Sequence, residues 1–176
     1  MKRKTEEVEI EVELGKDGEI DTDDEVLDHL LRSLMFYMDM EANIYAKWDL
    51  RHHLWEDLAI TLGKEINKKI EREEINRFGD IVMPMDDALV LVAVDISRTY
   101  VDIDLDIKEE EKDFDLTLVK EFIKALSRTI EATIHIKQIS GSNGHHIIEA
   151  VFKGFGVALG QALKESEELK STKGVL

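Results

Sequence analysis

Two short segments of this 176-residue chain carry the same arrangement of potential metal ligands. In DLRHHLWEDLAI, residues 49–60, two adjacent histidines are followed by a glutamate, and SNGHHIIEAVFK, residues 142–153, repeats that order. Residues three apart lie on one face of an α-helix, so the second histidine of each pair can share a face with the glutamate. Adjacent histidines point about 100° apart on a helix, so one pair could serve two different metal ions.

The repetition makes metal binding the best interpretation of these residues, because four of the six histidines belong to the two motifs. The other two, His29 and His135, are each more typical of a core or surface residue when considered alone. The order is not HExxH, which excludes the zinc-protease helix. Imidazole and carboxylate groups without thiolate suit manganese, iron, cobalt, nickel or zinc, and the residues leave that choice open. The motif residues are His52, His53, Glu56, His145, His146 and Glu149.

Hydrophobic periodicity places each motif at the start of an amphipathic helix. The first helix is expected from His53 to about Ile70, and the second from residue 145 to about residue 168. Two further amphipathic helices are expected at 24–38 and 116–130. Strands are expected at 8–14, 40–48, 77–84, 87–97, 100–107 and 131–139.

The order of these elements occurs twice along the chain: strands, a helix, a strand and a motif-bearing helix. We therefore expect an α+β fold of two similar halves, arising by internal duplication, each a mostly antiparallel sheet backed by two helices. No segment rich in proline, glycine and serine separates the halves. Residues 1–176 are thus expected to form one compact domain with half-repeats of about 1–75 and 76–176.

The composition excludes several classes of protein. The chain has 23 basic and 39 acidic residues, a formal charge of -16, which repels nucleic acid at long range. It has no cysteine, so neither a disulfide framework nor a thiolate metal site is possible. No apolar run is long enough to span a membrane, and no signal peptide precedes the first strand. We expect a cytoplasmic protein, in which a small anionic substrate would need a local cluster of cations or metal ions.

Longer segments carry a resemblance to a known family. They are RKTEEVEIEVEL, IDTDDEVLDHLL, HHLWEDLAITLG, INRFGDIVMPMDDAL, TIHIKQISGSNGHHIIEAVFKGF and the terminal STKGVL. With these segments and the two motifs, the sequence resembles imidazoleglycerol-phosphate dehydratase over nearly its whole length. The resemblance implies eight metal ligands, which use all six histidines: His29, His52, His53, Glu56, His135, His145, His146 and Glu149.

The resemblance also implies an activity and an assembly. The activity is the dehydration of D-erythro-imidazole-glycerol phosphate to imidazole-acetol phosphate in histidine biosynthesis, with the substrate imidazolate held between two Mn²⁺ ions per active site. The assembly is a homo-oligomer of twenty-four subunits with active sites between subunits. RKTEEV matches a family motif that makes Glu7 the expected acid–base residue, with Glu149 as the other candidate. Considered alone, Glu7 is expected to sit in a row with Glu9, Glu11 and Glu13, typical of the solvated face of an edge strand.

Cations that match the family's phosphate-binding positions are scattered along the chain. Guanidinium groups fit phosphate bidentately, and together these residues would supply the local positive cluster that an acidic protein requires. Asp86 in PMDDAL is expected to support a ligand or a turn rather than catalysis. The expected phosphate-binding residues are Arg77, Arg98, Lys153, Ser171 and Lys173.

The chain departs from the family pattern at several positions. Ser33 and Tyr37 replace a usual glutamine and histidine, and the segments KWDLRHH and SRT are shorter than their counterparts. None of these changes removes an expected metal ligand, but each affects an expected substrate or phosphate contact. Two alternatives therefore stay open: a non-catalytic assembly protein stapled by metal, and a diverged metal-dependent enzyme, for example a hydrolase, acting on another phosphorylated substrate.

Overall fold

The structure, a computed structural model, describes residues 1–15, 18–107 and 114–166, so Ser171 and Lys173 lie outside the described residues. The strands are β1 (Lys2–Lys4), β2 (Val8–Leu14), β3 (Ile20–Asp21), β4 (Ala42–Trp48), β5 (Phe78–Met85), β6 (Ala88–Ile96), β7 (Tyr100–Asp104) and β8 (Ala132–Ser140). The helices are α1 (Glu25–Tyr37), α2 (Arg51–Asn67), α3 (Leu116–Ile130) and α4 (Gly144–Leu163), with a short 3-10 turn at Arg72–Glu74.

The two halves have the same topology, which confirms the predicted α+β fold of two similar halves. The strand order is β1-β2-β4-β3 in the first sheet and β5-β6-β8-β7 in the second. The last pair of each sheet, β3 with β4 and β7 with β8, is parallel. The other pairs are antiparallel, so each half has a mostly antiparallel sheet, as the sequence predicted.

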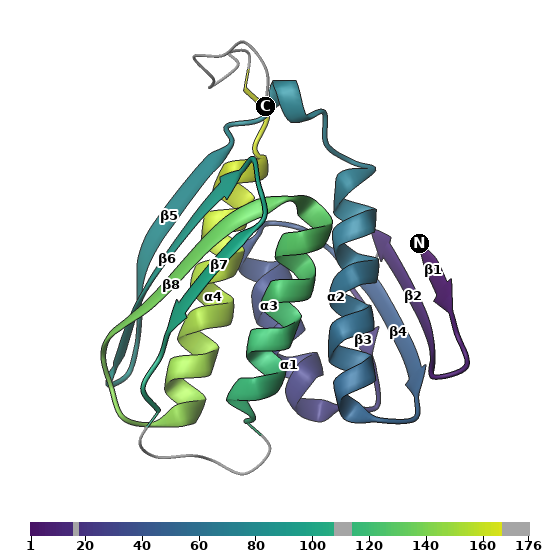
Figure 1. The fold of residues 1–176 in the computed structure, drawn as a ribbon, viewed down its shortest axis with the longest axis horizontal. Coiled ribbons are helices and arrows are strands. Elements are labelled where there is room, and N and C mark those ends of the chain that lie inside the picture. The colour runs from purple at the N-terminus through teal and green to yellow at the C-terminus, as the bar shows by residue number, and fades with distance from the viewer. Residues whose placement is uncertain (16–17, 108–113, 167–176) are drawn as a thin grey trace.

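The four helices lie between the two sheets (Figure 1). Helices α1 and α2 contact the first sheet, and α3 and α4 contact the second. The halves meet where α1 packs on α4 and α2 packs on α3. This layering explains the alternating burial along β2, because one face of that strand meets the helices and the other meets solvent.

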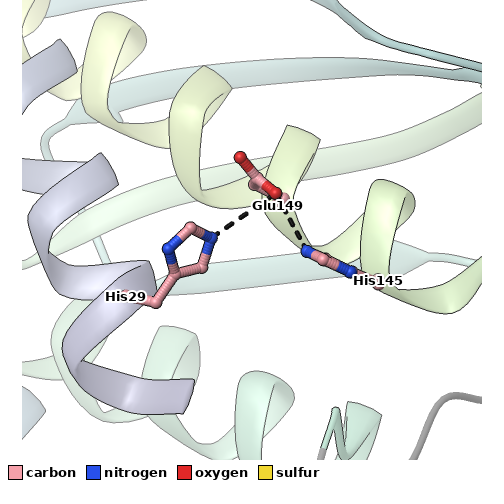
Figure 2. Close-up of side chains that lie close together, drawn as sticks. All are labelled: His29, His145 and Glu149. Atoms are coloured by element: carbon pink, nitrogen blue, oxygen red, sulfur yellow. Dashed lines mark hydrogen bonds and ion pairs between the residues drawn. The ribbon is translucent and has the colours of Figure 1, made fainter. Parts of the chain in front are cut away.

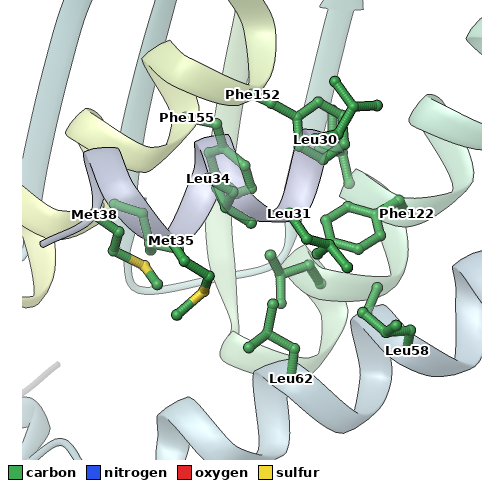
Figure 3. Packing of buried hydrophobic residues seen from close by; sticks show 14 of the residues in the cluster. Leu30, Leu31, Leu34, Met35, Met38, Leu58, Leu62, Phe122, Phe152 and Phe155 are labelled. Atoms are coloured by element: carbon green, nitrogen blue, oxygen red, sulfur yellow. The ribbon is translucent and has the colours of Figure 1, made fainter. Parts of the chain in front are cut away.

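Apolar side chains from both halves form one core between the sheets (Figure 3). Trp55 of α2 contacts aromatic rings of the other half, with ring centroids 6.3 Å from Phe122 and 6.4 Å from Phe152. Both contacts are edge-to-face, the arrangement that the aromatic quadrupole favours. All three side chains are almost fully buried, so the helix that carries the first histidine motif is fixed against the second half.

Periodicity predicted the helices and the long strands, but it missed two short strands and extended the last helix too far. Strands β1 and β3 are too short to show a period. Helix α4 ends at Leu163 instead of near residue 168, because Lys164 has an extended backbone and Glu165 forms a β-bridge with Ile75. None of the helices in the described part of the chain is long and apolar enough to cross a membrane.

Glycines on α4 allow α1 to come unusually close. A Cβ atom added at Gly156 would lie 2.5 Å from the Leu34 carbonyl oxygen, and one at Gly160 would lie 2.8 Å from the Met38 carbonyl oxygen. Both obstacles are backbone atoms, which no change of side-chain rotamer relieves. Glycine at these two positions therefore sets the spacing between the helices that join the halves.

We predict that Gly156→Ala destabilises the protein by about 1–3 kcal/mol, because the added methyl group must push α1 away from α4. The gain in helix propensity, about 0.5–1 kcal/mol, is too small to offset this cost. Gly154→Ala is the matched control, since its added Cβ would meet the Val92 side chain at 3.0 Å rather than backbone. Chemical denaturation checks the prediction, and equal stability of the two variants would contradict it.

Candidate metal centre

Three side chains from α1 and α4 converge on one point between the helices (Figure 2). His145 Nε2 lies 3.1 Å from Glu149 Oε2, and His29 Nε2 lies 3.5 Å from the same oxygen. One ligand atom from each of the three residues lies within 4.8 Å of the others. Two imidazoles and a carboxylate facing a common point form a donor set that suits a divalent transition metal.

Local structure explains why the cluster forms. The Asn143 side chain caps α4 by accepting a hydrogen bond from the His146 backbone N–H at 3.0 Å, which sets where the helix starts. His145 then lies in the first turn, and Glu149 lies one turn later on the same side. His29 reaches them because α1 runs in close contact with α4.

Glu149 is held in its charged form. Its side chain is buried, and its Oε1 accepts a hydrogen bond from Lys153 Nζ at 2.7 Å. Burial alone would raise the pKa of Glu149, but Lys153 and, to a smaller extent, His29 outweigh that effect and hold the pKa below its usual value. The Phe114 ring stacks on His145, with centroids 4.3 Å apart, and covers that imidazole.

The helical spacing of the second motif differs in detail from the expectation. The sequence suggested that His146 and Glu149, three residues apart, share a face. The structure instead pairs Glu149 with His145, four residues earlier, and turns His146 away toward the β5–β6 turn. The adjacent histidines do diverge, as a helix requires.

The second histidine of each motif is hydrogen bonded through Nδ1 to an aspartate. His146 Nδ1 lies 2.7 Å from Asp87 Oδ1, and His53 Nδ1 lies 2.8 Å from Asp49 Oδ1. Sequence reasoning missed both aspartates and assigned a supporting role only to Asp86, whose Oδ2 lies 3.5 Å from His146 Nε2. No spacing in the sequence indicates Asp87, because the hairpin turn that carries it is 59 residues from His146.

Asp87 is itself firmly held. Its Oδ2 accepts hydrogen bonds from the backbone N–H groups of Ser142 at 2.7 Å and Asn143 at 3.4 Å. These backbone bonds, the Ser142 one above all, together with the contact to His146, lower the pKa of Asp87 to about 2. The carboxylate therefore stays charged beside His146 throughout the neutral range.

The remaining candidate ligands do not join the cluster. The His52 ring lies against His53, with centroids 4.1 Å apart, and Glu56 accepts a hydrogen bond from Arg128 at 2.9 Å. His135 lies on the face of β8 turned away from the helices, 3.6 Å from Asp102. In residues 1–15, 18–107 and 114–166, the only group of three that could hold a metal is the one on α1 and α4.

Three of the expected phosphate-binding residues, Arg77, Arg98 and Lys153, lie in the described part of the chain. Arg77 donates two hydrogen bonds to Asp95, from Nε to Oδ1 at 2.6 Å and from Nη2 to Oδ2 at 3.1 Å. Its backbone N–H donates to the Ala162 carbonyl oxygen near the end of α4. Lys153, which contacts Glu149, is nine residues before Ala162 on α4. Nine residues span about 14 Å along a helix axis. Arg98 is exposed in the β6–β7 turn, where its charge, like that of Arg77, acts on Asp95. Among the described residues, Arg77 and Arg98 therefore lie together near Asp95, and Lys153 lies apart from them.

Glu7 lies in the turn between β1 and β2 rather than in the row of glutamates on β2. Thr5 Oγ1 accepts hydrogen bonds from the Glu7 and Val8 backbone N–H groups, which fixes the turn. Glu7 Oε1 is 3.8 Å from His53 Nε2. The structure thus places the candidate acid–base residue beside a candidate metal ligand.

Comparisons with known proteins agree on one family. A sequence model described as imidazoleglycerol-phosphate dehydratase matches residues 22–159. The chain is 55% identical over 177 residues to imidazoleglycerol-phosphate dehydratase of Pyrococcus furiosus, covering all of both chains. It is 42% identical over 182 residues to the enzyme of that name from Dictyoglomus thermophilum, covering 99% of this chain and 96% of the relative.

Solved structures show the same similarity. A crystal structure of the Pyrococcus furiosus protein in complex with (S)-C348 superposes with a TM-score of 0.97 at 55% identity, covering all of both chains. The crystal structure of imidazoleglycerol-phosphate dehydratase from Staphylococcus aureus gives a TM-score of 0.81 at 32% identity. That match covers 94% of this chain and 98% of the other.

The start of α2, which carries the first motif, is anchored by Asp24. This buried carboxylate caps α1 through the Leu27 backbone N–H and accepts hydrogen bonds from Arg51 Nε at 2.6 Å and Trp55 Nε1 at 2.9 Å. Burial would raise the pKa of Asp24, but the hydrogen bonds from Arg51, Trp55 and the backbone outweigh it, so the pKa is lowered. The charged form therefore joins the first turns of α1 and α2.

We predict that Asp24→Asn lowers the free energy of unfolding by about 1–3 kcal/mol at pH 7, because donors at a buried site lose a charged acceptor. Since the folded pKa is lowered, this stabilisation is present above the unfolded pKa of about 3.9 and is lost as pH falls through the folded value. The stability gap between wild type and variant should therefore shrink below about pH 4.

Urea denaturation at pH 7 and in acid measures this gap. Asp23→Asn is the control, because the neighbouring Asp23 is exposed and its positive φ of 59° suits asparagine. A gap that stays constant down to pH 2.5 would contradict the assigned role of the Asp24 carboxylate.

Proposed function

The chain belongs to the imidazoleglycerol-phosphate dehydratase family, and on that premise we propose that it converts D-erythro-imidazole-glycerol phosphate to imidazole-acetol phosphate and water in histidine biosynthesis. The observation that carries the proposal is the convergence of His29, His145 and Glu149. Their spacing, and the charged form of the glutamate, suit a divalent metal. We place the enzyme in the cytoplasm, with neither nucleic acid nor membrane as a partner.

Two Mn²⁺ ions per active site are the proposed cofactors. His29, His145 and Glu149 would hold one of them. Bound metal would act as a Lewis acid and favour the imidazolate form of the substrate ring. The imidazolate can then expel a hydroxyl group from the carbon chain attached to the ring. Neutral imidazole and carboxylate donors are compatible with Mn²⁺, and the absence of cysteine leaves no competing thiolate donor.

The remaining ligands are proposed to complete sites between subunits. His53 lies in the first turn of α2, His146 lies in the first turn of α4, and His135 faces away from the helices. One copy cannot direct these three side chains to the same point as Glu149, whereas neighbouring copies can bring them together. The same argument applies to Lys153, which one chain holds apart from Arg77 and Arg98. We therefore propose a homo-oligomer, of twenty-four subunits as in the family pattern, with Ser171 and Lys173 also contacting phosphate.

Glu7 is the proposed acid–base residue, and the structure supplies a reason to prefer it to Glu149. Both oxygens of Glu149 are already engaged, one by Lys153 and the other by His29 and His145. Glu7 is about half exposed and lies beside His53. A solvent-accessible carboxylate next to the metal ligands can accept and return the carbon-bound proton, while a buried ion-paired one is better suited to holding metal.

The test is turnover of imidazole-glycerol phosphate by metal-stripped protein, with and without added Mn²⁺, alongside the particle mass. We expect Mn²⁺ to restore both dehydration and a large assembly in the wild type. Glu7→Gln should bind Mn²⁺ and assemble normally but lose about 10²–10⁴-fold in turnover, the usual contribution of general acid–base catalysis. The control is Glu25→Gln, an exposed glutamate in the first turn of α1.

Two results would contradict parts of this proposal. Assembly with Mn²⁺ but without dehydration would favour the metal-stapled assembly protein or an enzyme for another phosphorylated substrate. Full turnover by Glu7→Gln would remove Glu7 from the acid–base role.

A further inference from the structure

The two motifs share a feature that their sequences do not: each second histidine has an aspartate at Nδ1. Asp49 is four residues before His53, in the loop that enters α2. Asp87 reaches His146 from the turn between β5 and β6. The two hydrogen bonds have almost the same length, 2.8 and 2.7 Å, although the aspartates come from unrelated positions of the two halves.

A carboxylate at Nδ1 decides which ring nitrogen carries the proton. A neutral imidazole has one N–H and one lone pair, and a charged carboxylate can only accept a hydrogen bond. A carboxylate also faces each Nε2, but farther away, with Asp86 3.5 Å from His146 and Glu7 3.8 Å from His53. The shorter hydrogen bond therefore places the proton on Nδ1, which leaves the lone pair on Nε2. Only a nitrogen with a lone pair can bind a metal, and a fixed partner at the other nitrogen also fixes the orientation of the ring.

We propose that Asp87 and Asp49 are positioning residues, which hold His146 and His53 in the Nδ1–H tautomer with Nε2 directed toward a metal ion. This inference rests on the proposed function, which makes both histidines metal ligands. It adds two residues that the motif does not contain. The first half orients His53 through a residue of the adjacent loop, and the second half orients His146 through a residue of a hairpin that is distant in sequence.

The contacts of Asp87 make Asp87→Asn a direct test of which nitrogen of His146 carries the proton. One carboxylate oxygen faces His146, while the other accepts backbone N–H groups of Ser142 and Asn143. In Asp87→Asn the single carbonyl oxygen must stay with the backbone donors, because an amide NH₂ cannot accept from them. The NH₂ group then faces His146 Nδ1, which must become an acceptor, so the proton moves to Nε2. The shape is kept and the tautomer is reversed.

The contacts of Asp49 lead to a different expectation and thus supply a matched control. Its Oδ1 faces His53 Nδ1 and also accepts the Leu50 backbone N–H at 2.6 Å. In Asp49→Asn the carbonyl oxygen can keep both contacts, so His53 should retain its tautomer despite the loss of the same charge. Asp49→Ala removes the acceptor altogether.

The first readout needs no metal. Nitrogen NMR of metal-free protein labelled with ¹⁵N-histidine distinguishes the tautomers, at a pH where the imidazoles are neutral. We expect His146 to change from Nδ1–H to Nε2–H in Asp87→Asn, and His53 to keep its Nδ1–H form in Asp49→Asn. A merely structural role for Asp87 would broaden or shift the signal without reversing the tautomer.

The second readout is Mn²⁺ affinity, measured by competition with a chelator. We expect Asp87→Asn and Asp49→Ala to bind Mn²⁺ about 10–100-fold more weakly than wild type. Asp80→Asn, an exposed aspartate at the other end of the same hairpin, should bind as wild type does.

The outcomes separate this inference from the function on which it rests. If wild type binds Mn²⁺ and Asp87→Asn keeps both the Nδ1–H tautomer and an affinity within twofold, the positioning role is overturned and the metal enzyme stands. If wild type binds no Mn²⁺, the proposed function fails and the inference fails with it.

Discussion

The close approach of α1 to α4 determines where the candidate metal centre forms. Backbone atoms near the end of α1 lie against Gly156 and Gly160, so no side chain separates the two helices there. The helices run in the same direction, and the contact that begins near Met38 continues back to His29. His29 therefore meets His145 and Glu149 across a helix pair that also joins the two halves of the fold. Stability and ligand geometry depend on the same spacing.

Duplication explains the architecture but not the details of the site. Both halves have the same strand order and place a histidine pair at the start of their last helix. In the second half, Glu149 faces a histidine of α1 and is held by Lys153; in the first half, the corresponding Glu56 is bound by Arg128. The two glutamates thus have different surroundings in one chain.

Much of this fold could be predicted from the sequence, because helices and long strands carry their own periods. The alternation in β2 and the helical stripe of α1 are examples, and the repeated motif located both histidine pairs. Asp87 and the separation of Arg77 from Lys153 could not be predicted in this way. Those features depend on which turn and which helix end lie beside each other, and spacing along one segment contains no such information.

The most direct test of the central claim is anomalous X-ray scattering at the manganese edge from crystals of the Mn²⁺-loaded protein. The account predicts a peak within bonding distance of His29 Nε2, His145 Nε2 and Glu149, with a further ligand from a neighbouring copy. Manganese bound elsewhere, or at this point without any residue of a second copy, would contradict a metal centre shared between subunits.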